Sequence, residues 1–199
     1  MLIDILVFDG LDEMDAWGPA EVFRSAEKRG ADVTARLVTR VPQDVVHGSY
    51  GLRFHPDAVW EPGAADVLVV PGGGWRAREP IGAWGEVKRG DLLPLLREAS
   101  EGTRLLAGVC TGTMLLAHAG LIGNRRASTH HAAWADLEAL GATLVRDRVV
   151  DDGDLVTSGG VTSGIDLALW LLHREFSADL ATAVAERMEY SPVLPTLST

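Results

Sequence analysis

The chain has 199 residues, of which 47% are hydrophobic and 23% charged, values typical of one globular domain that buries a full core. Its 18 basic and 28 acidic side chains give a formal charge of −10. The acidic residues are scattered rather than blocked, which argues against a nucleic-acid partner. The single cysteine excludes an internal disulfide and a multi-cysteine zinc site.

Two apolar segments raise the question of targeting or membrane insertion. The N-terminus, "MLIDILVFDG", has no basic region and carries Asp4, so it does not resemble a signal peptide. Residues 105–123 are uncharged and almost long enough to cross a bilayer, but they contain four glycines and change period midway. We therefore expect a cytoplasmic protein that has no membrane partner.

The first half of the chain alternates between strand and helix patterns. Residues 2–8 are short and apolar and predict a buried strand. Asp15 precedes an amphipathic stretch that predicts a helix ending near Gly30. Another strand is expected over 33–39, and an alternating, glycine-containing stretch over 45–60 predicts a hairpin.

The second half continues the alternation. Strands are predicted over 66–74 and 104–109 and at both sides of "DDGD" near residue 152, and helices over 91–101, 111–121, 128–142, 161–176 and 177–190. Such a pattern predicts an α/β fold with a mainly parallel sheet and helices on both faces. No linker or repeat interrupts it, so we expect one domain over residues 1–199.

Three features follow predicted strands at the edge where parallel sheets bind ligands. Asp15 follows the first strand, "PGGG" with Gly72 and Gly73 follows the strand at 66–70, and Cys110 follows the strand at 104–109. The carboxyl ends of parallel strands share one edge of the sheet. We therefore expect these residues to lie together although they are distant in sequence.

The setting of Cys110 is typical of a nucleophile. It lies between a strand and a helix with glycines nearby, as in a strained nucleophile elbow. A helix N-terminus is expected to lower the thiol pKa. The backbone N–H groups of Thr111, Gly72 and Gly73 are candidate donors to a developing anion, and Asp15 a proton donor or acceptor.

Each feature also has a simpler interpretation. A lone cysteine in an apolar stretch is often inert core, Asp15 is a candidate helix N-cap, and "PGGG" is a candidate plain loop. His130 and His131 are adjacent and point to opposite sides, which argues against a metal pair. Taken singly, these interpretations are favoured; taken together, the features indicate a thiol site.

Four motifs in order resemble the DJ-1/PfpI superfamily. They are "PGG" after a strand, "GVCTG" after a later strand, "RASTHH", and "TSGGVTSGIDLAL". The stretch "MDAWGPAEVF" is similar to the branch that contains isocyanide hydratases and the amidase-like domains of AraC-type regulators. The resemblance covers roughly residues 2–190.

The resemblance implies a flavodoxin-like three-layer sandwich, usually a homodimer, with a cysteine nucleophile and an acidic partner. Carried over, Cys110 is the nucleophile, Asp15 the acid and Thr111 the adjacent hydroxyl, while Gly72, Gly73 and His130 contact the substrate or its oxyanion. Peptidase-like members have histidine directly after the cysteine, where this chain has Thr111.

Other departures narrow the expected reaction. Chaperone- and glyoxalase-like members have glutamate where this chain has Asp15, and AraC-type regulators continue into a helix-turn-helix domain whereas this sequence stops at Thr199. Trp17 and Trp75 are expected at pocket edges and lie outside the family pattern.

The prediction is a cysteine-dependent hydratase that converts an isocyanide to an N-substituted formamide through a Cys110 thioimidate. Its partner is a small-molecule substrate, and neither a cofactor nor a metal is expected. Two alternatives stay open: another thiol enzyme of the superfamily, such as a glyoxalase-type hydratase or an amidase, and a non-catalytic redox-sensing or binding protein.

Overall fold

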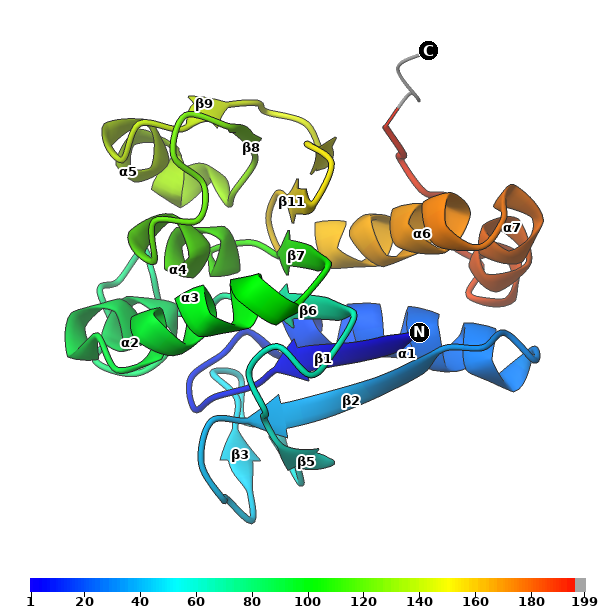
Figure 1. The fold of residues 1–199 in the computed structure, drawn as a ribbon, viewed down its shortest axis with the longest axis horizontal. Coiled ribbons are helices and arrows are strands. Elements are labelled where there is room, and N and C mark those ends of the chain that lie inside the picture. The colour runs from blue at the N-terminus through cyan, green and yellow to red at the C-terminus, as the bar shows by residue number, and fades with distance from the viewer. Residues whose placement is uncertain (196–199) are drawn as a thin grey trace.

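The computed structural model describes residues 1–195, which are arranged around a seven-stranded sheet (Figure 1). From edge to edge the strands are β10 (Val149–Asp151), β11 (Leu155–Ser158), β7 (Leu105–Gly108), β6 (Val67–Val70), β1 (Leu2–Leu6), β2 (Thr34–Thr39) and β5 (Ala58–Val59). All neighbouring pairs are parallel except β10 and β11. Leaving the short β5 aside, the parallel strands have the flavodoxin-like order 2-1-3-4-5.

Helices cover both faces of this sheet (Figure 1). One layer contains α1 (Glu13–Lys28), α6 (Ser163–Glu175) and α7 (Ala178–Arg187), and the other contains α2 (Ala83–Arg89), α3 (Leu92–Gly102) and α4 (Gly112–His118). Because both faces are covered, every residue of β6 and β7 is buried, as the continuous apolar runs predicted. The predicted three-layer α/β fold is confirmed.

Two small sheets lie beside the main one. The predicted hairpin at 45–60 is present as β3 (Val46–His47) paired with β4 (Arg53–Phe54). The second small sheet pairs β8 (Arg126–Ala127) with β9 (Thr143–Leu144), next to the 3-10 helix η1 (His131–Ala133) and α5 (Trp134–Ala139).

The predicted helix over 128–142 is wrong in its first half. Ser128 donates its backbone N–H to Thr157 Oγ1 at 2.8 Å, and Thr129 Oγ1 donates to the Cys110 carbonyl at 2.8 Å. These long-range bonds hold the segment in extended form against the main sheet, so helical structure begins only at His131. Helix α2 was not expected, because glycines adjoin both its ends and hide its short pattern.

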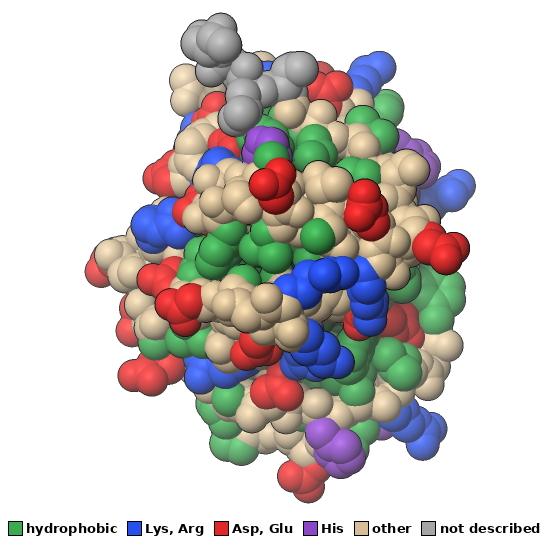
Figure 2. All heavy atoms as spheres, turned by 90° about the vertical axis from the view of Figure 1, so that its right-hand side faces the viewer, with side chains coloured by type: hydrophobic (Ala, Val, Ile, Leu, Met, Phe, Trp, Pro, Cys, Tyr) green, Lys and Arg blue, Asp and Glu red, His purple; other side chains and the backbone are tan. Residues whose placement is uncertain are grey.

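The charged side chains are scattered over the surface, as their distribution along the sequence predicted. Figure 2 shows acidic and basic side chains interspersed over the face seen from the right of Figure 1, with apolar groups exposed between them. The described helices all lack the combination of length and apolarity that crossing a bilayer requires.

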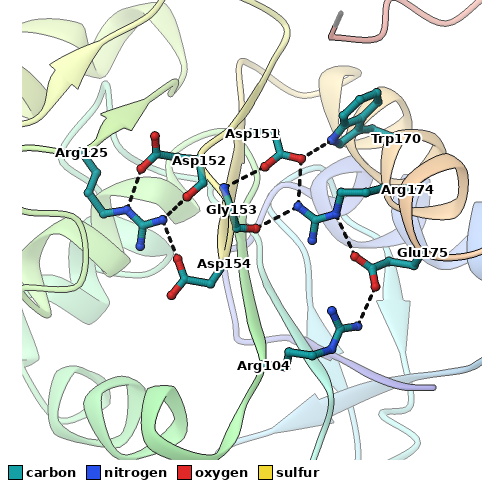
Figure 3. A network of polar contacts seen from close by, with 9 residues as sticks. All are labelled: Arg104, Arg125, Asp151, Asp152, Gly153, Asp154, Trp170, Arg174 and Glu175. Atoms are coloured by element: carbon teal, nitrogen blue, oxygen red, sulfur yellow. Dashed lines mark hydrogen bonds and ion pairs between the residues drawn. The ribbon is translucent and has the colours of Figure 1, made fainter. Parts of the chain in front are cut away.

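The turn between β10 and β11 is held by an ion-pair cluster (Figure 3). Arg174 Nη1 donates to Asp151 Oδ2 and to the Gly153 carbonyl, each at 2.8 Å, and Trp170 Nε1 donates to the same Asp151 oxygen at 2.7 Å. Arg125 pairs with two further carboxylates of the turn, Asp152 at 2.7 Å and Asp154 at 2.5 Å. The acidic turn is thereby neutralised by arginines from outside it.

Candidate active site

Cys110 occupies the sharp turn between β7 and α4 in a strained backbone conformation. Its φ is 55°, in the left-handed region that costs a residue other than glycine about 1 kcal/mol. The turn is fixed because the Cys110 N–H donates to the Gly159 carbonyl at 3.0 Å and its carbonyl accepts from Thr129 Oγ1. The side chain thus points to the carboxyl edge of the sheet, where only 5% of the residue is exposed.

Glycine at position 112 is required because the start of α4 lies directly against the end of β6. A Cβ on Gly112 would lie 1.8 Å from the Val70 carbonyl oxygen at the end of β6. No side chain can be accommodated there, so the glycine after the cysteine lets α4 start directly against β6. That contact brings the "PGGG" loop beside the thiol.

Asp15 reaches the same place from the first turn of α1 and is completely buried. The Gly72 N–H donates to Asp15 Oδ2 at 2.9 Å, and the Cys110 thiol beside the carboxyl group lowers the pKa of Asp15. Oδ1 has no hydrogen-bond partner within residues 1–195. The N-cap of α1 is Asp12, whose side chain accepts from the Met14 N–H at 3.2 Å, so capping does not explain Asp15.

Burial changes the titration of both groups. Burial first, and the Asp12 charge second, raise the pKa of Asp15 well above its ordinary range. Burial and then the Asp15 charge raise the pKa of the Cys110 thiol. The Val161 and Thr111 N–H groups at the sulfur lower this pKa, but they offset only part of the increase. The expectation that the α4 N-terminus lowers the thiol pKa is therefore wrong: a seven-residue helix does not offset burial beside a carboxyl group.

The remaining predicted residues surround the thiol but are already engaged. Gly72 N–H is bound by Asp15, and Gly73 N–H donates to Thr111 Oγ1 at 3.0 Å. The Thr111 hydroxyl accepts this bond and keeps its proton for another acceptor. His130 lies across a cavity from the turn, and its Nδ1 accepts from the Ala132 N–H at 3.1 Å.

Two cavities meet at Val161, the residue whose N–H contacts the sulfur. The apolar cavity, of about 400 Å³, is lined by Asp12, Glu13, Met14, Tyr50, Leu52 and Val161. The basic cavity, of about 320 Å³, continues on the other side, towards His130. Small molecules therefore have space on either side of the strained turn.

Sequence reasoning missed Val161 and misplaced Trp75. Val161 has a φ of 38°, a genuine outlier for a β-branched residue, and "SGGVTS" between a strand and a helix was the only signal. Trp75 is 2% exposed and donates from Nε1 to Asp136 at 2.7 Å, so it is packed inside rather than placed at a pocket edge. Trp17 packs edge-on against Phe54.

The fold and site define a class of protein: a flavodoxin-like α/β domain with a cysteine at a strained turn beside a buried carboxyl group. The DJ-1/PfpI family model matches residues 1–174, and the chain belongs to this family. No group of three or more potential metal ligands is assembled in the part of the chain that the structure describes.

Several relatives are similar over most of the chain. Isonitrile hydratase of Pseudomonas putida is 37% identical over 97% of this chain and 80% of its own length. The HTH-type transcriptional regulator CdhR of Pseudomonas aeruginosa is 29% identical over 96% of this chain, which spans 55% of the regulator. A THiJ/PfpI family protein from Pseudomonas syringae has a TM-score of 0.85 at 27% identity, covering 98% of this chain and 77% of that one.

Proposed function

We propose that the protein hydrates an isocyanide to an N-substituted formamide, with Cys110 as nucleophile and Asp15 as acid and base. The observation that carries the proposal is the buried pair formed by the Asp15 carboxyl and the Cys110 thiol. The similarity to isonitrile hydratase over almost the whole chain supports it. The apolar cavity beside Val161 suits an uncharged isocyano group.

The first step joins sulfur to carbon. Because burial disfavours two adjacent negative charges, Asp15 and Cys110 retain a proton between them. A sulfur lone pair forms an S–C bond to the terminal carbon of R–N≡C, and that carbon takes the proton from Asp15, giving the thioimidate R–N=CH–S. The Val161 and Thr111 N–H groups stabilise the thiolate that attacks.

The second step consumes water. Ionised Asp15 accepts a proton from a water molecule that the Thr111 hydroxyl orients, the water oxygen bonds to the thioimidate carbon, and Asp15 passes this proton to the nitrogen. The C–S bond then breaks with its electron pair returning to sulfur, while the added hydroxyl becomes the formyl carbonyl and gives its proton to the Asp15–Cys110 pair. The products are R–NH–CHO and the free thiol, so one water is added in each turnover.

The test is hydration of para-nitrophenyl isocyanide, followed through formamide absorbance. The wild-type protein is expected to turn over and Cys110→Ala to be inactive while keeping its circular dichroism and thermal midpoint. Absence of wild-type turnover, or equal turnover by the variant, would contradict the proposal.

The two other classes are separated by parallel measurements. Methylglyoxal hydration or amide hydrolysis in place of isocyanide turnover would indicate another thiol enzyme. A redox sensor would gain oxygen at Cys110 under mild peroxide without any activity, which intact mass detects. The thiol's burial and raised pKa argue against fast oxidation. Homodimer formation and a cytoplasmic location stay predictions.

A further inference from the structure

The basic cavity adjoins the apolar cavity at Val161, next to the turn that carries the thiol. Among its lining residues, Val161 contacts the Cys110 sulfur through its N–H, and Thr129 binds the Cys110 carbonyl. A molecule in this cavity therefore lies next to the strained turn that carries the reacting sulfur. The charges and hydrogen-bond donors of the other lining residues indicate which chemical group of a substrate the cavity can bind.

His130 contributes its imidazole ring to the lining of this cavity. Its Nδ1 accepts from the Ala132 N–H, so the proton of the neutral ring is on Nε2. Burial, then the charges of His131 and Arg76, lower the pKa of His130 and keep the ring neutral. The ring packs on Gly160, where a Cβ would lie 2.4 Å from its Cδ2, so this position must be glycine for the imidazole to fit.

Arg146 supplies an uncompensated positive charge. Its guanidinium lies 4.6 Å from the centre of the Trp134 ring, and no ion-pair partner is found for it among residues 1–195. Arg148, in the same cavity, is instead paired with buried Asp166 at 2.5 Å. Arg146 is thus the cavity's unpaired arginine, pre-positioned by stacking on an aromatic ring.

The other charged group in the lining is Asp147, an exposed residue whose backbone carbonyl accepts from Ser128 Oγ. Ser163, which also lines the cavity, begins the thirteen-residue helix α6, whose N-terminus adds a partial positive charge. An arginine fork, an imidazole N–H and a hydroxyl around one cavity are the donors that a carboxylate requires.

We propose that the natural substrate carries a carboxylate, which Arg146 and His130 bind in the basic cavity while the isocyano carbon lies at Cys110. The inference rests on the proposed function for its reaction, but the anion site is testable without it. A substrate bound at both ends has its reactive carbon oriented by its remote charge.

The first test compares isocyanides that carry a carboxylate with their methyl esters, over a short series of spacer lengths. Arg146→Gln is expected to lower kcat/KM for the carboxylates by about tenfold to a hundredfold, mainly through KM, and to leave the esters unchanged. Arg126→Gln, which removes an exposed arginine from the adjacent β8, is the matched control and should change neither. Arg146→Lys should restore part of the loss. Equal effects on acids and esters, or none, would overturn the proposal.

The second test uses the only cysteine and needs no turnover. Iodoacetate and iodoacetamide alkylate Cys110 through the same step: sulfur bonds to the CH₂ carbon, iodide leaves with the C–I pair, and the thiol proton passes to buffer. The ratio of the iodoacetate to the iodoacetamide rate should fall in Arg146→Gln and stay at the wild-type value in Arg126→Gln. An unchanged ratio would refute the anion site even if isocyanides are hydrated. A changed ratio without hydration would support the site and refute the proposed function.

Discussion

Asp151 and Asp15 lie at opposite ends of the sheet, and their different surroundings give the same type of side chain two different roles. Asp151, the last residue of β10, accepts from Arg174, Trp170 and the Gly153 N–H, so its charge is neutralised (Figure 3). Asp15 is completely buried, accepts from the Gly72 N–H beside the thiol, and has no cation beside it among residues 1–195.

The difference explains why one group stabilises the fold and the other is reactive. A carboxylate with an arginine partner keeps its charge and destabilises the fold when that partner is removed, whereas a buried one without a cation retains its proton and lowers stability when it ionises. The carboxyl edge of the sheet, at which the strained residues Cys110 and Val161 also lie, therefore holds groups that the fold does not neutralise.

The largest expected effect is the loss of activity when Asp15, which has no neutralising cation, is changed beside Cys110. Asp15→Asn keeps an oxygen acceptor for the Gly72 N–H but cannot supply a proton, so isocyanide hydration should fall by about a thousandfold. Steady-state kinetics on para-nitrophenyl isocyanide measure this. If Asp15→Asn retained more than a tenth of wild-type activity, general acid–base catalysis by Asp15 would be excluded.

The next effect lies in the ion-pair cluster. Arg174→Ala leaves Asp151 and Glu175 without their shared cation and should lower the free energy of unfolding by roughly 2 kcal/mol. Urea denaturation gives the value. Isocyanide hydration should be unchanged at a temperature at which both proteins are folded; a parallel loss of activity would show that the two regions are coupled.

Asp15→Asn should raise the free energy of unfolding, whereas Arg174→Ala should lower it. The raised pKa of Asp15 means that the folded state binds its proton more tightly than the unfolded state, whose aspartates titrate near ~3.9. The contribution of Asp15 to wild-type stability therefore declines as the pH rises from the unfolded-state pKa to the higher folded-state pKa of Asp15. The gain in Asp15→Asn should be near zero at acidic pH and about 1 kcal/mol, or ~3 °C in Tm, at neutral pH. A gain that is independent of pH would point to packing instead.

The smallest expected effect is at the rim of the same cluster. Asp154 pairs with Arg125, but its side chain is 72% exposed, so solvent screens the pair. Asp154→Ala should leave the urea midpoint within error of the wild type. A loss comparable with that of Arg174→Ala would mean that the turn depends on every one of its ion pairs rather than on the half-buried ones.

Local patterns in the sequence determined the fold class and the place of the main site residues. Apolar runs over residues 2–8, 66–70 and 104–109 specify buried strands, and parallel strands bring the residues after them to one edge. This is why the sequence alone predicts that Asp15, Gly72 and Cys110 lie together. The helix expected at residue 128 failed because long-range bonds to Thr157 and Cys110 override the local preference.

Only the tertiary structure decided the chemistry of that edge. The pKa of Asp15 and of Cys110 depends on how much water the surrounding helices remove and on which charges they leave nearby, and neither quantity is local in sequence. The same holds for the unpaired Arg146, because a cation is free or neutralised according to partners that folding brings from distant segments.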